Sequence, residues 1–362
     1  MNGNARWAGG MLAALLLVTD SRAAAPGGIV VAVTPVRQSL ARSDDVVVTV
    51  TLRNTSHTTL YMPTWQTPFA GVQAPLFDVT RDGLPVTYLG IQAKRAPPTA
   101  GAPGHADVVA LGPGASRSAR VELSALYRMD ITGAYSVRYR AEHLQVASRP
   151  DGFRPHGLAA AAPQAAAVWI DGRLPRGMPE PSPAAPPSGS GLAFAHCSNA
   201  QQDGIAGAVQ AGLAMAQDAD AYLQGQPLAA RYTGWFGPVD NARATTVARH
   251  FAAIRDAFAA RPITVDCACS QPWYAYVYPN APYTIHVCKA FWTAPLTGTD
   301  SKGGTLVHEM SHFTVVAGTG DWVVGQAATG ALAGSDPDRA IDNADSHEYF
   351  SENNPYRTVR RN

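Results

Sequence analysis

The chain has 362 residues, with 28 basic and 27 acidic side chains and a net charge of +1. This even balance leaves no surplus of cations for binding nucleic acid or anionic lipid, and it argues against both kinds of partner. The hydrophobic fraction of 46% is enough for the cores of two or three domains and too high for a disordered chain.

The first residues have the pattern of a secretory signal peptide, predicted to span residues 1–23. Arg6 precedes an apolar run over residues 7–18 that is too short to cross a bilayer. Ser21 and Ala23 place small residues at the positions that a signal peptidase requires. No later run approaches ~20 apolar residues, so no membrane anchor is expected. The sequence predicts a secreted protein, exported through the periplasm if the source is Gram-negative.

Residues 24–172 are predicted to form a β-domain. Short stretches rich in β-branched residues alternate with turns such as 81–83 and 112–114. This spacing is typical of an immunoglobulin-like β-sandwich. No cysteine and no catalytic cluster is apparent in this part of the sequence. The predicted strands cover residues 28–33, 46–52, 76–80, 84–89, 108–111, 119–123 and 135–139.

The chain changes character after residue 172. Residues 173–191 are rich in Pro, Ser and Gly, which predicts an exposed linker with a processing site. A second, mainly helical domain is expected over residues 192–362, which makes the fold class α+β. Its helices are predicted at 199–223, 239–260 and 303–316, and its strands at 263–266 and 283–287.

The predicted helix 303–316 contains the sequence His-Glu-Met-Ser-His at residues 308–312. His308 and His312 are four residues apart, so both imidazoles project from one helix face and can reach one metal ion. Glu309 lies beside them, where it can take a proton from a water molecule. The alternative is a helix with two solvated histidines, which the apolar residues around the motif disfavour.

A catalytic zinc ion needs a third protein ligand. A metzincin would have His at position 318, which is Gly here, and a thermolysin-like ligand would be a Glu farther downstream, of which Glu348 is the first. Asp321 is nearer, and Gly318 and Gly320 allow the chain to double back toward the helix.

The metal motif followed by Gly-Thr-Gly-Asp at residues 318–321 resembles the signature of the aspzincin metalloendopeptidases, the deuterolysin and peptidyl-Lys metalloendopeptidase group. The resemblance extends to Ala-Arg-Tyr-Thr-Gly-Trp-Phe-Gly at 230–237 and to residues 343–355, and it covers about residues 192–362. It implies a zincin-type catalytic domain, mainly helical with a small β-sheet.

The resemblance also implies the roles of individual residues. His308, His312 and Asp321 would bind one catalytic Zn²⁺, and Glu309 would be the general base and acid. Cysteine arithmetic alone leaves three disulfide pairings open. The resemblance implies one of them, with the pairs Cys197–Cys267 and Cys269–Cys288.

Two acidic residues on one predicted helical turn suggest the specificity. Asp345 and Glu348 are three residues apart and face the same way. The resemblance implies that they form the pocket for the residue after the scissile bond, and hence cleavage on the N-terminal side of Lys or Arg. The alternative is a structural role, in which Asp345 orients a zinc-binding histidine.

One position departs from the family pattern. The family has a Tyr, thought to donate a hydrogen bond to the oxyanion, where this chain has Val324. Loss of one such donor typically lowers the rate by ~10²–10³. Tyr349 and His347 are near in sequence to the predicted pocket and are candidate replacements.

These observations predict a secreted, monomeric zinc endopeptidase, made as a zymogen and acting on proteins or peptides. Residues 24–172 would be a pro-domain that chaperones folding or inhibits the enzyme, or else a permanent binding module. Two other classes are considered: an exported adhesin with a degenerate protease domain, suggested by Val324, and a metallohydrolase that acts on a non-peptide substrate.

Overall fold

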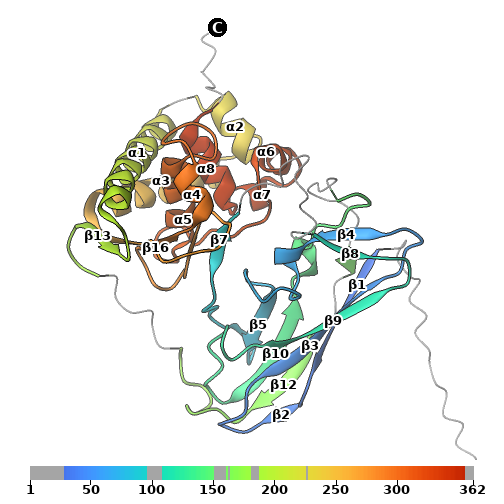
Figure 1. Ribbon diagram of the computed structural model, residues 1–362. Coiled ribbons are helices and arrows are strands. Elements are labelled where there is room, and N and C mark those ends of the chain that lie inside the picture. The colour runs from blue at the N-terminus through green and yellow to red at the C-terminus, as the bar shows by residue number, and fades with distance from the viewer. Residues whose placement is uncertain are drawn as a thin grey trace, which may run out of the picture.

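The computed structural model describes residues 28–95, 108–150, 160–161, 164–180, 187–225 and 227–354. The predicted signal peptide lies outside them. Figure 1 shows an N-terminal half made of strands and a C-terminal half made mostly of helices. None of the described helices is long and apolar enough to cross a membrane.

The N-terminal half consists of two main sheets around one hydrophobic core. The first has the strand order β11-β1-β3-β9, the second β2-β12-β10-β5-β6, and β4 pairs with β8. The inner faces alternate as expected for half-buried strands: Val48, Val50 and Leu52 of β3 are buried, as are Tyr135 and Val137 of β10. A two-sheet packing is therefore present, and its immunoglobulin-like topology stays a prediction.

The elements of this half are β1 (Ile29–Pro35), β2 (Ser39–Leu40), β3 (Val47–Asn54), β4 (Leu60–Pro63), η1 (Thr64–Gln66), β5 (Phe77–Arg81), β6 (Leu84–Pro85), β7 (Gln92–Lys94), β8 (Val108–Leu111), β9 (Ser116–Glu122), β10 (Gly133–Tyr139), η3 (Ala141–His143), β11 (Ala160–Ala161) and β12 (Ala166–Ile170). The predicted strand 84–89 is much shorter in the structure, because only Leu84 and Pro85 pair with β5.

The C-terminal half contains β13 (Gly191–Ala195), α1 (Asn199–Gln224), α2 (Ala230–Phe236), α3 (Asn241–Ala260), β14 (Pro262–Asp266), β15 (Ala275–Val277), β16 (Thr284–Val287), α4 (Lys289–Thr293), α5 (Lys302–His312), α6 (Gln326–Ser335), α7 (Pro337–Ala340) and α8 (Ala344–Glu352). Helix α5 packs against α1, α3 and α8 and also contacts β15, β16 and β7. The helix that carries the metal motif is therefore central in this half.

The predicted helix 303–316 is wrong at its C-terminal end, because α5 stops at His312. Phe313 has extended backbone angles. The chain then reverses through Gly318, whose φ is 66°, and the N–H of Thr319 donates to the carbonyl of Ser311. A continued helix would place residues 318–321 far from the histidines. The reversal places these residues beside the histidines instead.

One strand of the N-terminal half belongs to the sheet of the C-terminal half. That sheet has the order β13-β14-β16-β15-β7, and β7 forms its edge, antiparallel to β15. Figure 1 shows β7 between the two halves, beside α5. The expected linker also contacts the N-terminal half at its start, since Arg176 pairs with Asp82 and the carbonyl of Met178 accepts from Arg81.

Two disulfides reinforce the sheet of the C-terminal half. They join Cys197 to Cys267 and Cys269 to Cys288, the pairing that the family resemblance implies. Cys267 directly follows β14 and Cys288 directly follows β16. The bonds therefore tie together the C-terminal ends of neighbouring strands.

Candidate metal centre

Close packing fixes the position of the metal motif on α5. Ser301 caps the helix by accepting a hydrogen bond from the N–H of Gly304. Gly303 lies so near α1 that a Cβ would come within 3.0 Å of the Ala211 side chain. Every residue from Gly303 to His312 is buried. A helix enclosed on all sides holds the side chains of its motif in defined positions.

The two histidines are oriented by partners at their Nδ1 atoms. His312 Nδ1 lies 2.8 Å from the carbonyl oxygen of Thr319, and His308 Nδ1 lies 2.9 Å from Oδ1 of Asp345. Both partners are acceptors, so each Nδ1 carries the proton and each Nε2 presents a lone pair. The two Nε2 atoms are 3.1 Å apart. Two lone pairs directed at one small volume favour a cation there.

The chain reversal after α5 brings Asp321 to the same place. Its Oδ1 lies 3.3 Å from His308 Nε2 and 3.5 Å from His312 Nε2. Hydrogen bonds hold the loop to the start of α8: Gly320 donates to the carbonyl of Asp342, and Ala344 donates to the carbonyl of Gly320. These bonds position Asp321 independently of any ligand.

This donor set fits zinc. Bonds of about 2.0–2.1 Å at tetrahedral angles separate ligand atoms by ~3.3 Å, and the three separations are 3.1, 3.3 and 3.5 Å. Two imidazoles and one carboxylate are typical zinc ligands, and a catalytic site keeps a fourth position open. The second Asp321 oxygen, Oδ2, is buried and has no hydrogen-bond partner in the described part of the chain. The site therefore has the chemistry of a catalytic zinc centre.

The pKa values of the donor side chains show that the carboxylates at this site favour a positive charge among them. Burial lowers the pKa of His308, but the carboxylates of Asp321, Asp345 and Glu348 outweigh this effect and raise it well above its usual value. Burial lowers the pKa of His312 to about 4, which keeps it neutral. Burial raises the pKa of Asp321, yet the two histidines lower it more strongly, to about 2. Without a metal ion, His308 binds a proton and so provides this positive charge. A bound zinc ion would provide it instead.

Glu309 lies next to this donor set and is completely buried. Burial raises the pKa of its carboxyl to about 8, and a divalent cation beside it would lower that value. Its Oε1 accepts a hydrogen bond from the backbone N–H of Lys94 at 3.1 Å. Its Oε2 is buried without a partner among the described residues. One oxygen therefore faces a peptide nitrogen and the other remains available for a water molecule.

Asp345 and Glu348, both on α8, lie beside the donor set of His308, His312 and Asp321. Oδ1 of Asp345 lies 2.9 Å from His308 Nδ1 and 3.8 Å from the Lys94 ammonium. Glu348 Oε2 contacts Lys94 Nζ at 2.5 Å. Asp345 therefore contacts both a histidine of the donor set and the Lys94 ammonium, and its role in specificity stays a prediction.

Sequence reasoning missed two members of this cluster. Asp300 Oδ1 lies 3.3 Å from Lys94 Nζ, and Lys94 itself comes from the N-terminal half. Neither residue belongs to a local motif. The scarcity of lysine, with Lys94, Lys289 and Lys302 as the only three, was the one sequence feature that could have drawn attention to Lys94.

Both candidate replacements for the oxyanion donor are engaged elsewhere. The Tyr349 hydroxyl donates to Asp300 Oδ1 at 2.8 Å. His347 Nδ1 lies 3.0 Å from the carbonyl oxygen of Asn343, and its Nε2 lies 3.0 Å from Nδ1 of His250. The consequence of Val324 for the rate therefore stays a prediction.

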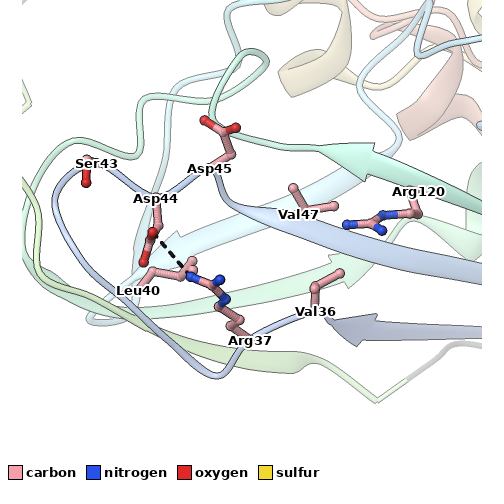
Figure 2. A pocket seen from close by; sticks show the side chains of 8 residues that line it. All are labelled: Val36, Arg37, Leu40, Ser43, Asp44, Asp45, Val47 and Arg120. Carbon is pink, nitrogen blue, oxygen red and sulfur yellow. Dashed lines mark ion pairs between the residues drawn. The ribbon is translucent and has the colours of Figure 1, made fainter.

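A surface pocket of the N-terminal half is a different kind of feature (Figure 2). It involves the segments around β2 and the start of β3, and Arg37 pairs with Asp44 at its edge, 3.3 Å apart. The eight residues that line it include no histidine or cysteine: Val36, Arg37, Leu40, Ser43, Asp44, Asp45, Val47 and Arg120. We therefore place the chemistry at the donor set on α5.

A buried helix with two histidines, an adjacent glutamate and an aspartate from the following loop defines the zinc-dependent hydrolase class. A family model described as lysine-specific metallo-endopeptidase, Aspzincin_M35, matches residues 223–352. An extracellular protease of Aeromonas hydrophila is 41% identical over 317 residues, which are 86% of this chain and 89% of the relative. A peptidyl-Lys metalloendopeptidase of Grifola frondosa is 37% identical over 284 residues, 77% of this chain and 79% of the relative.

A solved zinc peptidase from Grifola frondosa is 46% identical and covers 45% of this chain and all of that chain, with a TM-score of 0.43. The chain belongs to the aspzincin family of zinc metalloendopeptidases, as the full-length relatives and the family model show.

Proposed function

We propose that the protein is a secreted zinc endopeptidase, made as a monomeric zymogen, that cleaves peptide bonds on the N-terminal side of lysine and, more slowly, of arginine. The name of the Aeromonas relative, an extracellular protease, supports secretion. The names of the fungal relatives support lysine as the preferred residue. The main observation behind the proposal concerns Glu309. Its side chain is buried beside the three donors, and one of its oxygens accepts a hydrogen bond from the backbone N–H of a lysine.

The proposal assigns a role to each part of the chain. Residues 1–23 would direct export, and residues 24–172 would be a pro-domain that inhibits the enzyme or assists its folding. Processing within residues 173–191 would release a catalytic domain over 192–362. The insertion of β7 into the C-terminal sheet supports an inhibitory role for the pro-domain, because it covers α5.

His308, His312 and Asp321 would hold one Zn²⁺, which supplies Lewis-acid polarisation of the scissile carbonyl and activation of water. Asp345 and the carbonyl of Thr319 orient the imidazoles. Glu309 would accept the proton of the attacking water and return it to the leaving amine, because its Oε1 already faces a backbone nitrogen. In this structure β7 covers the site, and burial excludes bulk water and strengthens each of these electrostatic interactions.

The specificity proposal depends on the negative charge of Asp345 and Glu348. Both side chains are almost completely buried, and a buried carboxylate requires a cationic or hydrogen-bonding partner. A lysine side chain meets this need with a point charge at the end of an apolar stem, as Lys94 demonstrates here. Arginine carries the same charge on a larger, planar group and would fit less well.

The test is digestion of an unfolded protein, with peptides identified by mass spectrometry. We expect Lys to be strongly enriched directly after the cuts. Glu309→Gln is expected to lower kcat by at least ~10²–10⁴, the usual contribution of a general base. Asp338→Asn, which changes an exposed carboxylate of the same half of the chain, is the matched control. A chelator should abolish activity, and added Zn²⁺ should restore it.

Three results would contradict the proposal. Equal activity of the Glu309→Gln and wild-type proteins would rule out Glu309 as the general base. Cuts without enrichment of Lys or Arg directly after them would rule out the acidic pocket as the specificity site. Absence of all proteolysis after the linker has been cut and the N-terminal half has been removed would favour an exported binding protein instead.

A further inference from the structure

Strand β7 lies along the metal centre in the manner of an extended substrate. It pairs antiparallel with β15, in the register Gln92 to Val277 and Lys94 to Ala275. The Gln92 side chain donates to the carbonyl of Thr319 at 3.2 Å. The carbonyl of Lys94 accepts from the N–H of Tyr274 at 3.0 Å. Addition of an extended segment to a sheet edge is a general way in which proteins bind peptides.

The side chain of Lys94 fills a closed acidic pocket. Its exposure is 1%, and its ammonium lies 2.5 Å from Glu348, 3.3 Å from Asp300 and 3.8 Å from Asp345. The rings of Tyr274 and Tyr349 flank it, with centroids at 5.1 and 5.7 Å. A buried ammonium is tolerated only when it is paired in this way. The pocket therefore matches the chemistry of a lysine side chain.

Asp300 is held in this pocket by its own backbone and side-chain hydrogen bonds. It directly precedes Ser301, which caps α5, and it has a positive φ of 51°. Its N–H donates to Glu352 and its Oδ1 accepts from the Tyr349 hydroxyl. These bonds hold the carboxylate toward Lys94 Nζ, so that Asp300 is a third carboxylate around the ammonium, with Glu348 and Asp345.

The peptide bond between Ala93 and Lys94 occupies the position of a bond to be cut. Its nitrogen donates to Glu309 Oε1, and the residue after it is a lysine in the acidic pocket. Its carbonyl oxygen, however, accepts a hydrogen bond from Nη1 of Arg95 at 2.7 Å. The Arg95 guanidinium also lies over the rings of Trp65 and Trp273. The carbonyl is thus hydrogen-bonded to the side chain of the residue that directly follows β7, and not free as it would be in a substrate.

We propose that β7 is an intramolecular pseudo-substrate, in which Lys94 occupies the pocket for the substrate's lysine and Asp300 is that pocket's third carboxylate. This inference rests on the proposed endopeptidase function. It states what closes the zymogen and adds a specificity residue that neither the family motifs nor the sequence analysis indicated.

Peptide binding to the zinc-loaded full-length chain tests the proposal without turnover. All variants carry Glu309→Gln, and the probe is a fluorescent Ala-Ala-Lys-Ala peptide with blocked ends. We expect Lys94→Ala and Lys94→Met to bind it at least ~100-fold more tightly than the chain with Lys94, because the lost ion pair was buried. Lys302→Ala, which changes a lysine outside the pocket, is the matched control and should behave like the parent.

The role of Asp300 is tested in the same background. Asp300→Asn, added to Lys94→Met, should weaken binding of the lysine peptide by at least ~10-fold. It should leave unchanged the binding of a second peptide, identical except that uncharged norleucine replaces the lysine. A merely structural role would weaken both peptides equally. Equal binding of the lysine peptide by the parent chain and by the Lys94 variants would contradict the proposal that β7 is a pseudo-substrate.

Amine labelling supplies a measurement that does not depend on folding of the Lys94 variants. In the parent chain, Lys94 should react with an amine reagent at least ~100-fold more slowly than the exposed Lys289, and Asp300→Asn should accelerate it. An unchanged labelling rate of Lys94 in Asp300→Asn would show that Asp300 does not contribute to holding the Lys94 ammonium. If the peptide binds as expected but the Lys94→Met chain with Glu309 intact cuts nothing, the pseudo-substrate stands and the proposed endopeptidase function fails.

Discussion

Asp345 connects the proposed zinc ligands to the acidic side chains around Lys94. One of its oxygens lies 2.9 Å from His308 Nδ1, and the other accepts a hydrogen bond from the N–H of Gly325. Burial raises its pKa, but Lys94 and His308 lower it more, so that the carboxyl is ionised. An ionised partner at Nδ1 increases the electron density that Nε2 offers to a metal.

We therefore predict that Asp345→Asn lowers zinc affinity by about 10–100-fold. Asparagine keeps the size and a carbonyl oxygen but removes the charge that supports His308. Affinity is measured by competition with a chromophoric chelator. Asp338→Asn is the matched control, since the Asp338 side chain is 82% exposed and pairs with Arg243 on the surface. Equal affinities in both variants would show that Asp345 does not act through His308.

At the scale of residues, the sequence could indicate what local spacing determines. His308, Glu309 and His312 follow from helix periodicity, and the glycines before Asp321 indicate a reversal. Asp300 and Lys94 could not be found in this way. Lys94 is separated from Glu309 by 215 positions, and only the tertiary pairing of β7 with β15 brings them together.

At the scale of elements, η3 joins the N-terminal half to the loop after Asp321. The imidazole of His143 stacks on the indole of Trp322, with ring centroids 3.4 Å apart. Arg140 and Arg339 lie over the same indole, whose N–H donates to Asp342. Burial, followed by the charges of Arg140, Arg339 and Arg138, lowers the pKa of His143 to about 2. The contact therefore requires a neutral imidazole.

This contact should weaken in acid. The pKa of His143 is about 2 when folded and near 6.5 when unfolded. The stabilisation is therefore complete above pH 6.5 and is lost as the pH falls toward the folded value. At pH 5 the loss is at most ~2 kcal/mol, from 1.36 kcal/mol per pKa unit.

His143→Phe keeps an aromatic ring but cannot be protonated. Urea unfolding at pH 7 and pH 5, in the Glu309→Gln background, should show a smaller acid destabilisation for this variant than for the parent. Its matched control is His57→Phe, which changes an exposed histidine of the N-terminal half. Identical pH dependence with and without His143 would contradict the prediction.

Elements with a strong local pattern could be predicted, and short ones could not. The helices predicted at 199–223 and 239–260 are present as α1 and α3, because their apolar residues recur at helical spacing. Strand β7 has only three residues, Gln92, Ala93 and Lys94, and all are buried. A strand that buries a Gln and a Lys has no alternating pattern, since its partners come from a distant part of the chain.

At the scale of the whole molecule, cutting the linker should not by itself separate the two halves. Besides β7, the Asn280 side chain donates to the carbonyl of Tyr88, and Arg339 donates to the carbonyl of Glu142. These contacts and the stacked His143 are distributed over several elements on each side. A noncovalent complex is therefore expected to persist after the covalent connection is lost.

The prediction can be measured on a Glu309→Gln chain that carries a site for a sequence-specific protease after Pro187, where residues 187–190 are exposed. After complete cutting at neutral pH and micromolar concentration, the halves should elute together in size-exclusion chromatography. Lys94→Met should shift the elution toward separate halves, because it removes the buried ammonium and leaves the carboxylates of Glu348 and Asp300 unpaired. Lys302→Met serves as the control and should co-elute. Separation of the halves with Lys94 intact would mean that the linker alone keeps β7 on the edge of the sheet, so that processing and activation would be a single step rather than two.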